Sequence, residues 1–298
     1  AREPIDAFCH LGDMSYNDSA KTVEEFRLKW RATLGTRGYR ELLPKVPLYG
    51  TLDDHELVDN AKLYDMPAEE RAAGLQAWFE HAAIPNLGQG RIWNSYRWGH
   101  AVEVFVLDCR NERRPETLGS DDPIYISKEQ LAWLKQAVPA SPCHFKVMLN
   151  SVPITELPGA WAIQTQDRWQ GYAAQREELL AALDDVDNVW WLSGDFHVGL
   201  VVRLEAEGKR RKVWEILGGP GGNDSDTLAQ LAALPYVYEK LVPEEQFDYF
   251  SVKTAATWLT FDPHRDEVRV RFADAQSGAI TYDRVLSQRG DPRDPGSA

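Results

Sequence analysis

The sequence is most informative at Val46-Pro47-Leu48-Tyr49-Gly50-Thr51-Leu52-Asp53-Asp54-His55-Glu56. Its apolar first part, residues 46–52, predicts a short core strand, and three acids and a histidine follow directly. Adjacent carboxylates raise each other's pKa, so such a group at the end of a core strand indicates bound cations. A solvated acidic turn is the alternative, but the apolar run before the acids favours a cation site.

Three other apolar runs end in side chains of the same chemical kind. In open α/β sheets ligands bind at the carboxyl ends of the strands, so these side chains are expected to converge there. Oxygen and nitrogen ligands from several strand ends suit two metal ions held close together, the arrangement used for phosphoryl transfer. The runs are residues 5–11, 144–149 and 188–192, and they lead into Gly12-Asp13-Met14-Ser15-Tyr16, Asn150-Ser151-Val152-Pro153 and Gly194-Asp195-Phe196-His197.

Each of these candidate ligands also has a structural interpretation. Tyr16 follows Asp13 by three residues, and a phenol oxygen favours a hard trivalent ion such as Fe³⁺, but Gly-Asp-x-x-Tyr also describes ordinary Asp-capped turns. Asn150 offers an amide oxygen to a hard metal or satisfies loop backbone. Asp195 and His197 are alternate residues, and on an extended segment they would point the same way. A turn aspartate and a packed histidine are the alternative for that pair.

Composition limits the classes of function. The chain has 298 residues and a formal net charge of −13, which makes it a poor candidate for nucleic-acid binding through clustered Lys and Arg. Anionic substrates stay possible, because bound cations can reverse the local charge of a site.

The chain's three cysteines, Cys9, Cys109 and Cys143, lie in or beside strand-like runs and are interpreted as buried hydrophobic residues. No apolar run approaches the roughly 20 residues of a membrane span.

Strands and helices alternate through the first two thirds of the chain. Helices are predicted at residues 22–34, starting near Asp18 or Ser19, and at 68–83, 127–138 and 173–183. Ser127 and Gln130 fit a reciprocal capping box. After residue 195 an antiparallel pattern predicts strands at residues 198–205, 212–217, 256–262, 267–273 and 279–285. The pattern predicts two sheets packed face to face with helices outside, in one domain of residues 1–289 with a flexible tail at 290–298.

Taken together, the order and spacing of these motifs resemble the PhoD-like alkaline phosphatases of the calcineurin-like metallophosphoesterase superfamily. The resemblance covers nearly the whole chain. It rests on the four segments above and on Tyr96-Arg97-Trp98-Gly99, Leu107-Asp108-Cys109-Arg110, Glu129-Gln130-Leu131-Ala132-Trp133-Leu134, Asp167-Arg168-Trp169-Gln170-Gly171-Tyr172 and Leu217-Gly218-Gly219-Pro220-Gly221.

The resemblance implies an α/β fold, a four-layer α/β/β/α metallophosphoesterase sandwich of two mixed sheets flanked by helices, and a binuclear site. By position, Asp13 would bridge the metals, Tyr16 would bind an Fe³⁺-like ion and Asp54 the second metal. Three further ligands would be Asn150, Asp195 and His197. His55, beside Asp54 in the catalytic segment, would protonate the leaving group or stabilise the transition state. Fe³⁺ and Ca²⁺ are the implied ions, with Mn²⁺ or Zn²⁺ as alternatives.

The chain departs from the family pattern at its start. The family has an earlier strand carrying a Cys that binds the first metal, and this chain begins too late to contain it. Cys9 does not replace it, because it lies four residues before Asp13, about 13 Å away along an extended strand. The vacant strand position is expected to be filled by upstream sequence, by another chain or by a rearranged strand.

The sequence therefore predicts a metal-dependent hydrolase of small phosphoric monoesters or diesters. A degenerate relative that binds a phosphate ligand without hydrolysing it is the alternative, and phosphotriesters or cyclic nucleotides are other possible substrates. Substrate choice is expected to lie in loops such as 151–170 and 218–250. The absence of a signal-peptide pattern favours a cytoplasmic over an exported location, and the oligomeric state stays open.

Overall fold

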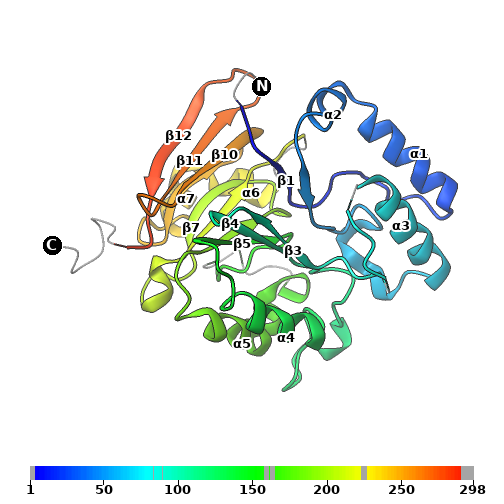
Figure 1. The fold of residues 1–298 in the computed structure, drawn as a ribbon, viewed down its shortest axis with the longest axis horizontal. Coiled ribbons are helices and arrows are strands. Elements are labelled where there is room, and N and C mark those ends of the chain that lie inside the picture. The colour runs from blue at the N-terminus through cyan, green and yellow to red at the C-terminus, as the bar shows by residue number, and fades with distance from the viewer. Residues whose placement is uncertain are drawn as a thin grey trace.

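The computed structural model describes residues 4–82, 84–88, 90–157, 161, 165–222 and 227–289 (Figure 1). The predicted tail at 290–298 lies outside this part. The main element is a seven-stranded mixed sheet with the order β3-β4-β5-β6-β8-β7-β9. Its strands are β3 (Asn94–Trp98), β4 (Val102–Val106), β5 (Phe145–Asn150), β6 (Val189–Ser193), β7 (Gly199–Arg203), β8 (Trp214–Gly218) and β9 (Phe247–Ser251).

The parallel centre of this sheet is buried on both faces, which explains its continuous apolar runs. Alternate residues Phe105, Met148 and Trp191 pack under α4 (Lys128–Ala137) and α5 (Ala173–Leu183), which lie together on one face (Figure 1). Their neighbours along the strands pack on the opposite face against the second sheet. The centre of the molecule is therefore a helix, sheet and sheet arrangement, as the sequence predicts.

The second layer of strands consists of two separate pieces. The strands β1 (Phe8–His10) and β2 (Leu48–Gly50) form a parallel pair, and β10 (Ala255–Asp262), β11 (Glu267–Asp274) and β12 (Ile280–Leu286) form an antiparallel sheet. Within the described residues, β1 pairs with β2 alone. Cys9 packs against the core between the two strand layers but is only partly buried, whereas Cys109 and Cys143 are buried as predicted.

A third group of helices supports the segment that follows β2. The helices α1 (Val23–Leu34) and α3 (Ala68–His81) pack together, and α2 (Arg37–Leu42) lies nearby (Figure 1). At Gly74 of α3, an added Cβ would lie 2.3 Å from Leu57 Cδ2 and 3.1 Å from Phe26 Cζ, so a larger residue would displace these two buried side chains. Because Leu57 comes two residues after His55, α3 buttresses the acidic segment directly.

The structure corrects several details of the prediction. Helix α1 is capped by Thr22, which forms the reciprocal capping box with Glu25, and not by Asp18 or Ser19. Ser127 accepts from the Gln130 backbone, but the Gln130 side chain bonds to Asp108 and Glu112 instead of completing the box. Strands β7 to β9 extend the first sheet, so the antiparallel last third divides between both sheets. The sequence did not predict α2, β3, β9, α6 (Thr227–Ala232) or α7 (Pro235–Leu241).

Within the described residues, no helix combines the length and the apolar character needed to cross a bilayer.

Candidate metal centre

The loops that follow β1 and β2 meet closely enough to require glycine. Gly12 has a φ of +105°, and an added Cβ there would lie 2.3 Å from Asp53 Cβ. The buried Glu56 carboxylate accepts from the backbone N–H groups of Met14 and Asp53, the latter at 2.9 Å. The two loops therefore form one rigid unit that places Asp13 beside the acidic segment.

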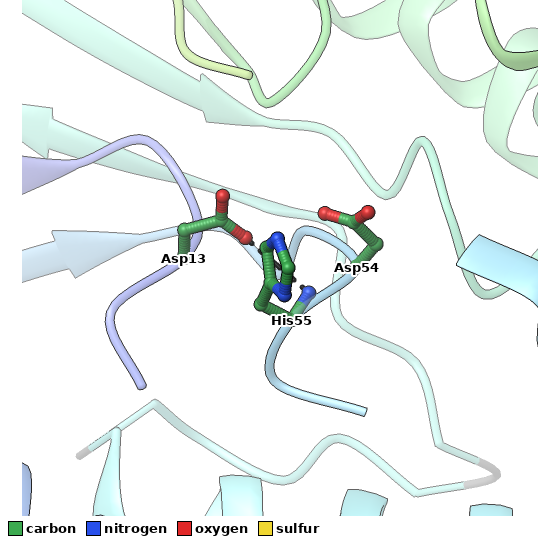
Figure 2. Close-up of side chains that lie close together, drawn as sticks. All are labelled: Asp13, Asp54 and His55. Carbon is green, nitrogen blue, oxygen red and sulfur yellow. Dashed lines mark hydrogen bonds between the residues drawn. The ribbon is translucent and has the colours of Figure 1, made fainter. Parts of the chain in front are cut away.

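Asp13, Asp54 and His55 lie side by side on these two loops (Figure 2). One ligand atom from each lies within 4.8 Å of the other two, a separation suited to a shared cation. The His55 backbone N–H donates to Asp13 Oδ1 at 3.3 Å, which fixes the aspartate relative to the acidic segment.

Tyr16 lies at the open side of this group. Its hydroxyl donates to Asp13 Oδ2 at 3.4 Å, and its ring lies 4.1 Å from the His55 ring, centroid to centroid. Burial and the Asp13 carboxylate raise the pKa of the phenol. A phenolate at this position therefore requires a cation beside it, which fits the predicted ligand role of Tyr16.

Asp195 and His197 enter the site from the loop after β6. The premise that they lie on an extended segment is wrong, because their φ angles are +64° and +49°. His197 Nε2 still lies 3.9 Å from Asp13 Oδ2. Of the six non-glycine residues with positive φ in the described part, three are Asp13, Asp195 and His197. Such backbone strain concentrates at functional sites, where surrounding contacts maintain it.

The sequence analysis assigned no role to Arg110, yet it lies at the middle of the site. Its buried guanidinium donates through Nε to Asp53 Oδ1 and through Nη2 to Asp195 Oδ1 at 2.5 Å. Nη2 is also 3.8 Å from Asp54 Oδ1. One sequence feature could have identified Arg110. It ends the motif that follows the apolar run of β4, Leu107-Asp108-Cys109-Arg110.

A second cluster of possible ligands contains Asp53, Asp54 and Asp195, again with one oxygen from each within 4.8 Å of the others. Asp54 is thus common to both clusters. The resemblance gave the bridging position to Asp13, whereas Asp54 is the shared residue in this geometry. We refer to Asp13, Asp53, Asp54, Glu56 and Asp195 as the acidic centre.

Both ends of the Asn150 side-chain amide have hydrogen-bond partners within the protein. Its Oδ1 accepts from Cys109 Sγ at 2.8 Å and from Trp169 Nε1 at 3.5 Å, and its amide nitrogen donates to the Val152 carbonyl. These contacts match the structural interpretation of a buried strand-end amide. Ligation by Asn150 would require the amide to leave Cys109 and Trp169.

The electrostatics of the acidic centre show an excess of negative charge. Burial and neighbouring carboxylates together raise the pKa of Asp13, and burial together with Asp13 raises the pKa of Glu56 to about 8. Burial also raises the pKa of Asp53, although Arg110 opposes this shift. The pKa of Asp54 is lowered, because Arg110 and His55 outweigh the effect of its burial.

The residues present fit bound cations. The acidic centre contains five carboxylates, and Arg110 pairs with three of them, Asp53, Asp54 and Asp195. Asp53 Oδ2 and Arg110 Nη1 are buried without a hydrogen-bond partner. Carboxylates that are hard to ionise in a buried cluster become ionised readily when a divalent or trivalent cation is bound. Hard oxygen ligands of this kind suit metal ions in general.

Comparison with known proteins gives the family. A family model described as PhoD-like phosphatase matches residues 1–272. The chain belongs to the PhoD-like phosphatase family. Alkaline phosphatase D of Bacillus subtilis (strain 168) is 25% identical to this PhoD-like chain over 284 residues, which cover 77% of the chain and 48% of that relative. The chain thus spans about half the length of the relative it matches.

Solved structures confirm the PhoD-like fold. A structure described as that of PhoD superposes with a TM-score of 0.75 at 20% identity, over 96% of this chain and 64% of that one. Purple acid phosphatase PPD1 from yellow lupin seeds gives a TM-score of 0.62 at 13% identity, over 95% of this chain and 46% of that one. The predicted metallophosphoesterase sandwich is therefore the fold of this chain.

Proposed function

We propose that this PhoD-like chain hydrolyses small phosphoric esters with the help of two metal ions bound at the acidic centre. The observation that carries this proposal is the pair of ligand clusters that share Asp54, each with its ligand atoms within 4.8 Å of one another. Two adjoining clusters suit the paired cations of phosphoryl transfer, which lie about 3.5–4 Å apart. Family membership supports the same class of reaction.

The donor types suggest which ion each side would hold. Asp13, Tyr16 and His197 would bind the harder ion, with Fe³⁺ favoured because Tyr16 can supply a phenolate. Asp54 and Asp195 would bind the second ion, with Ca²⁺ favoured and Mn²⁺ or Zn²⁺ as alternatives, and Asn150 would join them after leaving Cys109. Such ions polarise phosphoryl oxygens and lower the pKa of an attacking water.

His55 is placed to move a proton to the leaving alkoxide. Its Nδ1 lies 2.7 Å from Asp18 Oδ1, so Asp18 orients the ring and leaves Nε2 as the other proton-carrying atom. Burial lowers the pKa of His55, but Asp54, Asp13 and Asp18 outweigh it and raise the pKa above its usual value. The imidazolium therefore persists to higher pH, as a general acid requires.

A panel of nitrophenyl esters tests the proposed reaction. We expect chelator-treated protein to hydrolyse nitrophenyl phosphate monoesters or diesters only after Mn²⁺, Ca²⁺ or Fe is restored, with triesters included to define the range. Asp54→Asn should abolish the metal-dependent rate, and Asp184→Asn, which removes a carboxylate paired with Lys209 and Arg210 just after α5, should retain it. No hydrolysis of any ester by a chain that binds no metal would support the non-hydrolytic alternative.

Tyr16→Phe tests the ion assignment separately. Iron-loaded protein should show a visible phenolate-to-Fe³⁺ absorption band that this variant lacks. A band of equal strength in Tyr16→Phe would contradict the assignment of Tyr16 as the iron ligand.

A further inference from the structure

A surface hollow of about 510 Å³, which we call the cavity, lies outside the candidate ligands themselves. It is bounded by the end of η1 (Asp59–Tyr64), the first half of α3 and the loop that follows β4. Small-molecule sites commonly measure about 300–1,000 Å³, so this space can hold a group the size of an aromatic ring with substituents.

Two walls of this cavity continue from loops that carry the acidic centre. The η1 helix begins at Asp59, whose Oδ1 lies 3.9 Å from His55 Nε2, and it leads to Tyr64 at the cavity wall. The opposite wall begins at Asn111, the residue after Arg110. These connections along the chain link the cavity to His55 and Arg110 of the candidate metal centre.

Two arginines give the cavity its chemical character. Arg71 donates through Nε and Nη2 to Asn111 Oδ1 at 3.1 and 2.5 Å, which fixes its side chain at the wall. Arg114 also lines the cavity, and burial together with the nearby Arg114 charge lowers the pKa of Arg71. Among the described residues, neither arginine forms an ion pair with a carboxylate, although the chain carries 46 acids and 33 bases. Glu116 lines the cavity as well and reduces its net charge to +1.

The rest of the wall is apolar. Leu63, Met66 and Leu75 line it, and the Tyr64 ring is 56% exposed. An exposed aromatic residue beside two guanidinium groups that form no ion pair among the described residues matches a ligand with an apolar body and an anionic end.

We infer that this cavity is the subsite for the leaving group of the substrate, and that it selects phosphoesters whose alcohol is aromatic or apolar and carries a second oxyanion. This inference rests on the proposed phosphoesterase function. The second oxyanion is a carboxylate or another phosphate, since both present oxygens that an arginine fork can bind. Arg71 and Arg114 are the specificity residues, and Tyr64 contacts the apolar part.

Three aryl phosphates test the subsite by kinetics. We expect kcat/KM for 4-carboxyphenyl phosphate and for benzene-1,4-diyl bisphosphate to exceed that for phenyl phosphate by about tenfold, mainly through a lower KM, because a charge-assisted contact is gained. The better of the two anionic esters identifies the oxyanion. Equal kcat/KM for all three esters in the wild type would overturn the inference.

Arg114→Met is the main variant, because Arg114 is exposed and removing it leaves the core intact. It should remove most of the preference for the anionic esters, and Arg114→Glu should reverse that preference. Arg40→Met, which removes an exposed arginine from α2, is the matched control. An equal loss of preference in Arg40→Met would mean that general surface charge, and not the cavity, selects the substrate.

Direct binding separates this inference from the proposed reaction. Saturation-transfer NMR should show 4-hydroxybenzoate bound to wild type and much less bound to Arg114→Met, with phenol giving no such difference. This result with no hydrolysis of any ester would support the cavity and reject the phosphoesterase proposal. Normal ester hydrolysis with equal 4-hydroxybenzoate binding by both proteins would reject the cavity and keep the phosphoesterase proposal.

Discussion

Two arginines in this molecule, Arg110 and Arg210, each lie among carboxylates. The two groups differ in the number of carboxylates for each positive charge. Arg110 bonds to Asp53 and Asp195 and lies 3.8 Å from Asp54 Oδ1 within the acidic centre, which also contains Asp13 and Glu56. Arg210 binds three carboxylates at 2.6 to 3.1 Å, and Lys209 adds a second cation to the group. We call this second group the Arg210 cluster; its members are Glu177, Asp184, Glu205, Lys209 and Arg210.

The direction of the pKa shifts separates the two groups. In the Arg210 cluster, hydrogen bonds from Arg210 lower the pKa of Glu177, and those from Arg210 and Lys209 outweigh burial to lower that of Asp184. In the acidic centre, burial and the neighbouring carboxylates raise the pKa values of Asp13 and Glu56. In the Arg210 cluster, Arg210 and Lys209 already stabilise the charged carboxylates, so this group needs no bound ligand. The acidic centre is balanced only if cations are added, and this difference distinguishes a structural ion-pair network from a metal site.

Arg110→Met should have the largest effect on stability. It leaves Asp53 buried without its partner, which costs about 3–5 kcal/mol in the free energy of unfolding of the chelator-treated protein. Arg210→Met should cost roughly 1 kcal/mol, because its partners Glu177 and Glu205 are partly exposed. Urea unfolding of both variants measures the difference.

Metal addition provides the control for this pair. Saturating Mn²⁺ should raise the free energy of unfolding of Arg110→Met more than that of wild type, because the metal replaces the missing positive charge. For Arg210→Met the gain should equal that of wild type. Similar losses in the two variants, without a metal effect, would show that the two groups are of the same kind.

His55→Ala should lower kcat by roughly 10²-fold, the scale of a proton-transfer group, with metal content unchanged. His144→Ala is the comparison, since His144 pairs with Asp266 at 2.5 Å away from the acidic centre and should leave kcat intact. Joint loss of both metals in His55→Ala would instead identify His55 as a ligand, which the Asp13–Asp54–His55 cluster permits geometrically.

The stability of the metal-free protein should fall as the pH rises. The folded-state pKa of Glu56 is raised to about 8 from an ordinary value of 4.5, so its protonated form is favoured by folding. That contribution is complete below pH 4.5 and is lost by up to about 1.4 kcal/mol per pH unit as the pH rises towards 8. Thermal melts in chelator at pH 5 to 9 should show this slope, and Mn²⁺ should flatten it. A melting temperature that rises with pH would contradict the predicted sign.

The sequence was sufficient for the features that depend on local pattern. Apolar runs of five to seven residues, each followed by Asp or Asn, located core strands and most of the candidate ligands. They could not show that β1 and β2 belong to a different sheet from β5 and β6, because sheet membership is decided by packing between distant segments. The short edge strand β3 and the strand β9 were missed because their side chains are largely half-buried or exposed.

The residues that the sequence analysis missed act through contacts with distant segments. Arg110 lies 57 and 85 residues from Asp53 and Asp195, and nothing near it in the sequence indicates an acidic partner. Asp18 lies 37 residues from His55 and was considered only as a helix start. For Asn150 the sequence suggested a role that its contacts do not require. Its strand-end position indicated a metal ligand, but Cys109 and Trp169 donate hydrogen bonds to its amide oxygen.

Calorimetric titration of chelator-treated protein with Mn²⁺ tests most directly whether the acidic centre is a binuclear metal site. Wild type should bind two equivalents. Asp54→Asn should weaken both binding events by tenfold or more, because Asp54 belongs to both ligand clusters, whereas Asp184→Asn in the Arg210 cluster should match wild type. No Mn²⁺ binding by wild type, or unchanged binding of two equivalents by Asp54→Asn, would contradict the account.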